Sequence, residues 1–234
     1  MHPSKKIGKT LLLCCTLIWT PTLWGQNDSL KIFFQPSFEN APLSLVEYDN
    51  TPPRGRQIEV FKCYLSNVAL YDGDQLVFSE ENSFHLLDAA HPTTLILTLN
   101  LPADLSYSSL QFNVGIDSLT SISGAFGGDL DPTKGMYWTW QSGYINFKLE
   151  GKADNCPARH HRFQFHIGGY QASFNALQSV KLELEAPRDQ VQIAVDIDQL
   201  LNQIELSETY QVMSPNRQSV ELAQFLPSLF SVLE

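Results

Sequence analysis

The sequence predicts an all-β fold, an antiparallel β-sandwich with a short C-terminal helix. Three observations support this class. Apolar and polar residues alternate along several segments, as in strands that bury one face. Turn-forming Asn, Asp, Gly and Pro separate those segments, and sequence with helical periodicity is scarce. Residues 26–234 show no internal boundary, and a chain of that length suits a single domain.

Nine segments carry the strand pattern. Val180, Leu182 and Leu184, for example, alternate with charged residues, so their apolar side chains share one face. In chain order the predicted strands are Leu30 to Gln35, Gln57 to Tyr71, Ser83 to Leu87, Thr94 to Leu99, Ser109 to Ile116, Tyr137 to Glu150, Arg162 to Ile167, Val180 to Glu185 and Val191 to Ile197.

Two short helices are predicted near the C-terminus. The first covers Ile197 to Gln203 and the second Ser219 to Val232. Pro227 interrupts the second helix, because proline lacks the amide hydrogen that a helix interior requires.

The first 25 residues have the pattern of a secretory signal peptide. Lys5, Lys6 and Lys9 precede an apolar run from Leu11 to Trp19, and Gly25 suits the last position before cleavage. That run is too short to span a bilayer stably, and no second run of spanning length follows. We therefore expect an exported protein, periplasmic, secreted or at the cell surface, without a transmembrane segment.

The net charge of the chain makes nucleic acid and anionic membranes poor candidates as partners. The formal net charge is -10, and the leader removes three lysines and no acids, which lowers it to -13. Such an acidic protein is a poor ligand for nucleic acid or anionic membranes.

Two cysteines, Cys63 and Cys156, remain after the leader is removed. We predict that they form a disulfide in the oxidising compartment. The sequence does not show that their Cα atoms come close enough. A metal site made of the two is a weaker alternative, because neither has a CxxC neighbour.

The remaining tryptophans, Trp138 and Trp140, lie two positions apart beside a turn rich in Gly and Asp. On a strand this spacing places both rings on one face. They are either a buried aromatic pair in the core or rings that face a ligand.

Five histidines remain, and two are candidate metal ligands. His166 lies opposite Phe163, Phe165 and Ile167 on its predicted strand, so it faces away from their apolar face. His85 lies within a predicted strand, where a hydrogen-bonded core histidine is the alternative. The other three fall in predicted loops or turns: His91, His160 and His161.

Asp117, Asp129 and Asp131 surround a Gly-rich loop. Their oxygens suit Ca²⁺ and suggest a second cation site. Aspartate is also an ordinary residue of turns, and the spacing is not that of an EF-hand loop.

Several segments together resemble the MbnP-like family of exported bacterial copper-binding proteins. The tryptophan segment from Gly135 to Gly151 is the most specific of them. The others are Tyr64 to Asn67, Phe84 to Asp88, Gly115 to Ser118, Gly127 to Pro132 and Phe165 to Gly169.

The resemblance implies copper as the bound metal, with His85 and His166 among its ligands. It also implies that a partner dihaem peroxidase of the MbnH type can oxidise Trp138 or Trp140 to kynurenine. No histidine lies two residues from Trp138 or Trp140, so a Trp-x-His ligand set is not evident in this chain.

The predicted function is therefore copper storage, uptake or delivery. We expect no enzymatic activity, since no GxSxG, HExxH or P-loop pattern occurs in the sequence. The alternative is a metal-free surface module that binds glycan or protein through the Trp138 and Trp140 patch.

Overall fold

The computed structural model describes residues 28–140, 143–185 and 189–233. The predicted signal peptide, residues 1–25, lies outside these ranges. The strands are β1 Asp28–Phe38, β2 Ala41–Pro42, β3 Arg56–Asp72, β4 Gln75–Ser79, β5 Phe84–Asp88, β6 Ile96–Leu101, β7 Ser109–Val114, β8 Tyr137–Trp138, β9 Gly143–Ala153, β10 Arg162–Gly168, β11 Tyr170–Gln171, β12 Phe174–Asn175, β13 Gln178–Glu183, β14 Gln190–Asp196, β15 Gln211–Val212 and β16 Phe230–Val232.

The helices are short. The α-helices are α1 Ser118–Ile122, α2 Asp198–Leu201 and α3 Arg217–Ala223, and the 3₁₀ turns are Pro92–Leu95, Gly128–Leu130, Pro132–Lys134, Arg159–His161 and Leu226–Leu229. No helix in the described part of the chain is long and apolar enough to span a membrane.

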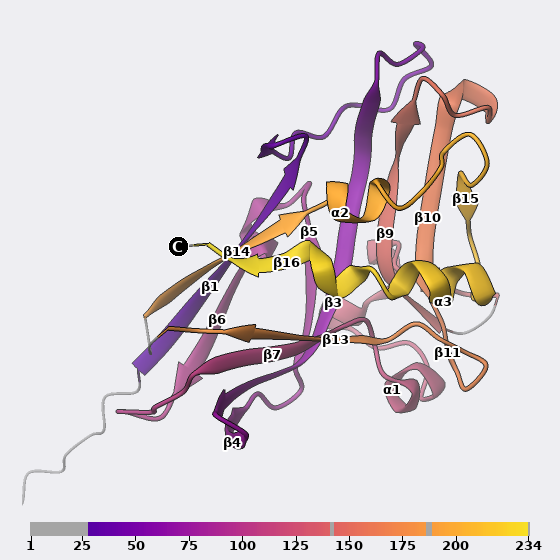
Figure 1. The fold of residues 1–234 in the computed structure, drawn as a ribbon. Helices are drawn as coiled ribbons and strands as arrows, with labels where there is room; N and C mark the ends of the chain where they lie inside the picture. The colour runs from indigo at the N-terminus through magenta and orange to yellow at the C-terminus, as the bar shows by residue number, and fades with distance from the viewer. Residues whose placement is uncertain (1–27, 141–142, 186–188, 234) are drawn as a thin grey trace, which may run out of the picture.

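Two sheets form the β-sandwich (Figure 1). The smaller runs in the order β16-β14-β1-β2, with β6 also paired to β1, and the larger runs β13-β7-β3-β9-β10-β15. β4 and β5 also pair with β3, and β8 pairs with β9. The all-β prediction is confirmed, and most pairs are antiparallel. The sheets are nevertheless mixed, because β1 pairs with β14, and β10 with β15, in parallel.

The main core lies between the two sheets and confirms the predicted alternation. Every second residue of β1 is buried, as are Val191, Ile193 and Val195 of β14. Rings from both sheets meet edge to face, since Phe34 lies 6.1 Å from Phe112 between centroids.

The predicted C-terminal helix is present but shorter than expected. α3 ends at Ala223, and after the 3₁₀ turn that contains Pro227 the chain becomes strand β16. α3 packs against β10, where Ser219 Oγ donates to the Gly168 carbonyl at 2.9 Å and accepts from its amide at 3.0 Å. α3, at the right of Figure 1, thus covers β10 of the larger sheet, away from the smaller sheet at the left.

The disulfide prediction is wrong in this structure, because both cysteines are free and buried. Cys63 pairs with Phe147 in the middle of β3, whereas Cys156 follows the far end of β9, where Ala153 pairs with Arg56. Seven residues of strand separate Arg56 from Cys63, which is roughly 20 Å. A disulfide requires Cα atoms within about 7 Å.

Candidate functional site

The outer face of the larger sheet, opposite the main core, carries a row of polar residues. Asp88, Lys62, Lys148 and His166 lie in register across β5, β3, β9 and β10. Their strand neighbours on the other face, such as Phe147, are core residues. The pleat therefore directs the four polar side chains away from the core.

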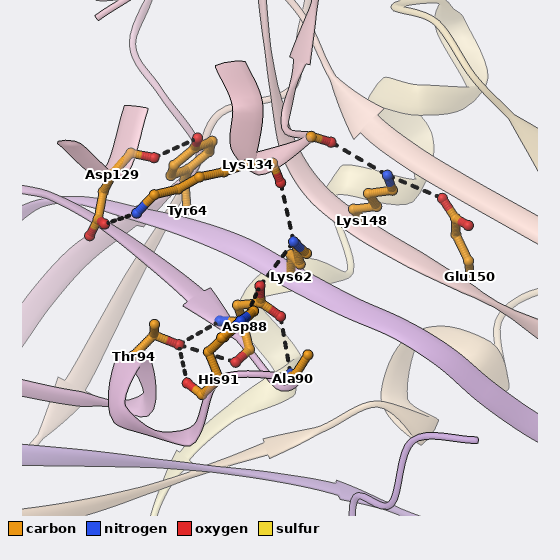
Figure 2. A network of polar contacts seen from close by, with 11 residues as sticks. Lys62, Tyr64, Asp88, Ala90, His91, Thr94, Asp129, Lys134, Lys148 and Glu150 are labelled. Carbon is orange, nitrogen blue, oxygen red and sulfur yellow. Dashed lines mark hydrogen bonds and ion pairs between the residues drawn. The ribbon is translucent and has the colours of Figure 1, made fainter. Parts of the chain in front are cut away.

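Ion pairs and hydrogen bonds connect this row to the loop above it (Figure 2). Lys62 Nζ lies 2.9 Å from Asp88 Oδ2 and donates to the Lys134 carbonyl at 3.1 Å. Lys148 Nζ donates to the Gly135 carbonyl at 3.4 Å and lies 3.3 Å from Glu150 Oε1. The two lysines thus fix the loop on the sheet.

Asp129 anchors the same loop from the other side. Its Oδ2 accepts from the Leu86 amide at 3.1 Å and its Oδ1 from Lys134 Nζ at 2.6 Å, while its carbonyl accepts from Tyr64 Oη at 2.9 Å. These bonds hold the chain that leads into Met136 and Trp138 over the outer face.

A second, smaller apolar cluster results beside the polar row. It is formed by Tyr64, Leu86, Ile116, Leu130, Met136, Trp138, Tyr144 and Ile145. Trp138 lies directly on Gly168, where a Cβ atom would stand only 2.9 Å from its Cζ3. Because Gly168 is two residues from His166 on the same strand, Trp138 covers the sheet next to His166.

Trp138 and Trp140 do not share a strand face, contrary to the prediction. The predicted strand from Tyr137 to Glu150 divides into β8 and β9, and Trp140 lies in the turn after β8. Trp138 is 6% exposed and Trp140 is 66% exposed, although their ring centroids are only 6.3 Å apart. Of these two tryptophans, only Trp140 therefore has a ring that is open to a ligand.

His166 forms the tightest polar pair of this face. It is nearly buried, and its Nε2 lies 2.6 Å from Glu150 Oε1. Burial alone would raise the pKa of Glu150, but the hydrogen bond from His166 and the positive charge of Lys148 outweigh it. The result is a pKa of about 2, so Glu150 stays ionised.

His85 is not part of this site. It pairs with Leu65, a core residue, and so points to the opposite face of the sheet from His166. β3 and β9 also separate the two histidine strands, a lateral distance of roughly 14 Å. The predicted pair of His85 and His166 therefore cannot bind one copper ion.

His85 instead forms its own acid pair, with Nε2 2.6 Å from Glu80 Oε2. Burial alone would raise the pKa of Glu80, but the hydrogen bonds from His85 and Ser83 outweigh burial. The pKa of Glu80 is therefore lowered.

The remaining histidines lie in turns, as predicted. His91 Nδ1 lies 3.0 Å from Asp88 Oδ2, and His161 Nδ1 lies 3.1 Å from the Cys156 carbonyl. His160 and His161 both adopt a left-handed backbone, with φ of 60° and 58°.

The three aspartates of the predicted second cation site do not converge. Asp117 caps α1 by accepting from the Thr120 amide at 2.9 Å, and Asp131 caps the 3₁₀ turn Pro132–Lys134 by accepting from the Thr133 amide at 2.8 Å. Asp129 is bound to Lys134. Capping and pairing account for all three aspartates, and among the described residues no three acidic or metal-ligating side chains gather there to hold Ca²⁺.

Sequence reasoning missed the acidic and basic partners on this face, namely Asp88, Lys62, Lys148 and Glu150. The alternation in β9 was a usable signal, because Lys148 and Glu150 fall on the face opposite Phe147 and Leu149. The register of β9 against β3 and β10 could not be read from the sequence.

Together, fold and site define a β-sandwich protein with a polar, histidine-bearing outer face on its larger sheet. The sequence model of the MbnP family matches residues 27–214, so the chain belongs to the MbnP family. MbnP from Methylosinus trichosporium has a similar fold, with a TM-score of 0.52 over 78% of this chain and 80% of that one, at 14% identity. No curated protein sequence matches the chain.

Proposed function

We propose that this MbnP-family protein is exported and binds copper, for storage, uptake or delivery, without catalysing a reaction. The observation that carries the proposal is the His166–Glu150 pair, an imidazole nitrogen and a carboxylate oxygen 2.6 Å apart on the outer face. Imidazole suits copper, and a tetragonal set of nitrogen and oxygen donors is typical of Cu(II). The predicted leader at residues 1–25 supports export.

The donor set fits copper only as a two-ligand site. Within the ranges that the structure describes, no group of three or more His, Cys, Asp and Glu converges. His166 and Glu150 would supply two donors and water the others. Copper takes the place of the proton that the pair shares, so binding weakens as pH falls.

Lys148 opposes the metal. Its ammonium group lies 3.3 Å from Glu150, so a cation bound there meets an unfavourable positive charge. Replacing Lys148 with a neutral residue should therefore tighten copper binding.

A calorimetric titration of copper into the chain without its leader tests the assignment of the copper site. We expect about one equivalent in the wild type, loss in His166→Ala and tighter binding in Lys148→Gln. His85→Ala is the matched control, since it removes a comparable histidine–glutamate pair from the other face. Undiminished binding in His166→Ala, or loss in His85→Ala, would refute it.

A dihaem peroxidase of the MbnH type belongs to the same proposal as a partner. Trp140, at 66% exposure, is the ring that such an enzyme can reach directly, whereas Trp138 is covered. Peptide mass spectrometry across Gly135 to Lys148, on protein from its native host, measures the conversion. Two unmodified tryptophans with the partner expressed would remove this part of the proposal.

A further inference from the structure

A cleft of about 690 Å³ opens on the polar outer face, beyond His166 toward the upper ends of β9 and β10. Its floor is formed by Glu59, Glu150, Arg162 and Gln164. This volume lies within the range of about 300–1,000 Å³ that is typical of small-ligand sites.

Three segments distant in the sequence form the walls. The connection between β2 and β3, which contributes Tyr48, loops over the top of the sheet in Figure 1. The turn with His160, together with Tyr210 and the edge strand β15 that begins at Gln211, completes the rim.

The charged groups in the floor are largely buried, and each already has an oppositely charged or hydrogen-bonding partner, although Arg162 Nε has no hydrogen-bond partner among the described residues. Arg162 Nη2 lies 3.0 Å from Glu59 Oε1, and these side chains are only 13% and 6% exposed. Glu150 is bound by His166, and the neighbouring Lys152 by Asp49. Buried ion pairs add little net stability, so stability alone gives little reason for a charged floor.

The charge of the cleft is balanced. Its lining includes two acids, Glu59 and Glu150, and two arginines, Arg159 and Arg162, so their formal charges cancel. An ion of either sign would therefore gain little here. An apolar ligand would displace the water that is hydrogen-bonded to the polar floor and would offer no hydrogen bonds in its place. That loss is costly.

Neutral hydrogen-bonding groups remain for a ligand. Gln164 and Gln211 pair in register on β10 and β15, and their side-chain amides form no hydrogen bond within the described part of the chain. Each amide offers both donors and an acceptor, as vicinal hydroxyl groups require. Tyr210 beside them adds an aromatic ring with a polar end.

The backbone at the rim is strained. His160 and His161 both adopt positive φ, a conformation that L-residues other than glycine rarely adopt. Arg159 and His160 of this turn line the cleft. Backbone strain of this kind concentrates at functional sites.

We propose that this cleft binds a neutral saccharide, with Gln164 and Gln211 bonding its hydroxyl groups and Tyr210 packing on a sugar ring. This site is separate from the exposed Trp140, which lies in the turn after β8 and does not line the cleft. It shares Glu150 with the copper site but does not require the metal.

Saturation-transfer NMR on the chain without its leader, in the presence of a metal chelator, tests the proposal. The probes are glucose, galactose, mannose, N-acetylglucosamine and their common disaccharides, with acetate and tetramethylammonium as charged comparisons whose methyl protons can report transfer. We expect transfer to at least one saccharide and none to the charged probes. No transfer to any saccharide at millimolar concentration, or transfer to a charged probe alone, would overturn the assignment.

Variants locate the binding. Gln164→Ala and Tyr210→Ala should weaken it at least tenfold, whereas Gln171→Ala, an exposed glutamine on β11, should not. Loss in Trp140→Ala with retention in both cleft variants would place the ligand on the aromatic turn and refute the cleft. The chelator makes the result independent of copper.

Discussion

Replacing Glu150 with glutamine should destabilise the protein at neutral pH and make its stability less sensitive to acid. The change keeps the size of the side chain but removes the charge that His166 and Lys148 share. Folding lowers the pKa of Glu150 from 4.5 to about 2, which corresponds to roughly 3 kcal/mol at about 1.4 kcal/mol per unit. Because the carboxylate is partly open to solvent, screening reduces this to about 1–2 kcal/mol.

The sign follows from the depressed pKa. An acid whose pKa falls on folding stabilises the native state above its unfolded pKa, and that stability is lost as pH falls from 4.5 towards 2. Urea unfolding with a chelator present should therefore show wild type above Glu150→Gln by about 1–2 kcal/mol at pH 6, and by less than half of that at pH 3.

Glu183→Gln is the matched control, since Glu183 is 73% exposed and pairs only with the exposed Lys181. Its stability should stay within about 0.5 kcal/mol of wild type at both pH values. A gap for Glu150→Gln that is equal at pH 6 and pH 3 would contradict the reasoning, because the pair would then contribute through packing and not through charge.

Three further predictions follow from burial. Gly168→Ala should cost about 1–3 kcal/mol in urea unfolding, because its Cβ would meet Trp138, whereas Gly127→Ala has open space and should cost far less. Both buried cysteines should titrate as free thiols in unfolded, unreduced protein, and Cys63 should react slowly in the native state because burial raises its pKa. Trp140→Phe should shift the fluorescence to the blue and reduce acrylamide quenching, whereas Trp138→Phe should leave a quenchable emission.

The strands could be predicted because local alternation determines them. β1, β3, β10, β13 and β14 all fall within a few residues of their predicted bounds. The break between β8 and β9 was missed, although the sequence carries a signal for it. The apolar positions change from Trp138 and Trp140 to Ile145, Phe147 and Leu149, and the polar stretch that ends at Gly143 lies between them.

The site was predicted less well because it depends on register. His166 was correctly placed opposite the core from its own strand alone. Its partner Glu150 comes from the neighbouring strand, where His166 pairs with Lys148. Only the register across β5, β3, β9 and β10 shows that His85 faces the other way.

One face of the larger sheet thus carries two chemically different regions, and His166 lies at their boundary. On one side Met136 and Trp138 exclude water, and on the other the cleft is lined by paired charges and free amides. Because Glu150 belongs to both regions, variants of Glu150 cannot separate the two proposed activities. His166→Ala and Gln164→Ala can: the first should abolish copper binding and keep saccharide binding, and the second should do the reverse. If both variants lost both ligands, the face would be a single cooperative site and the assignment of separate sites would fail.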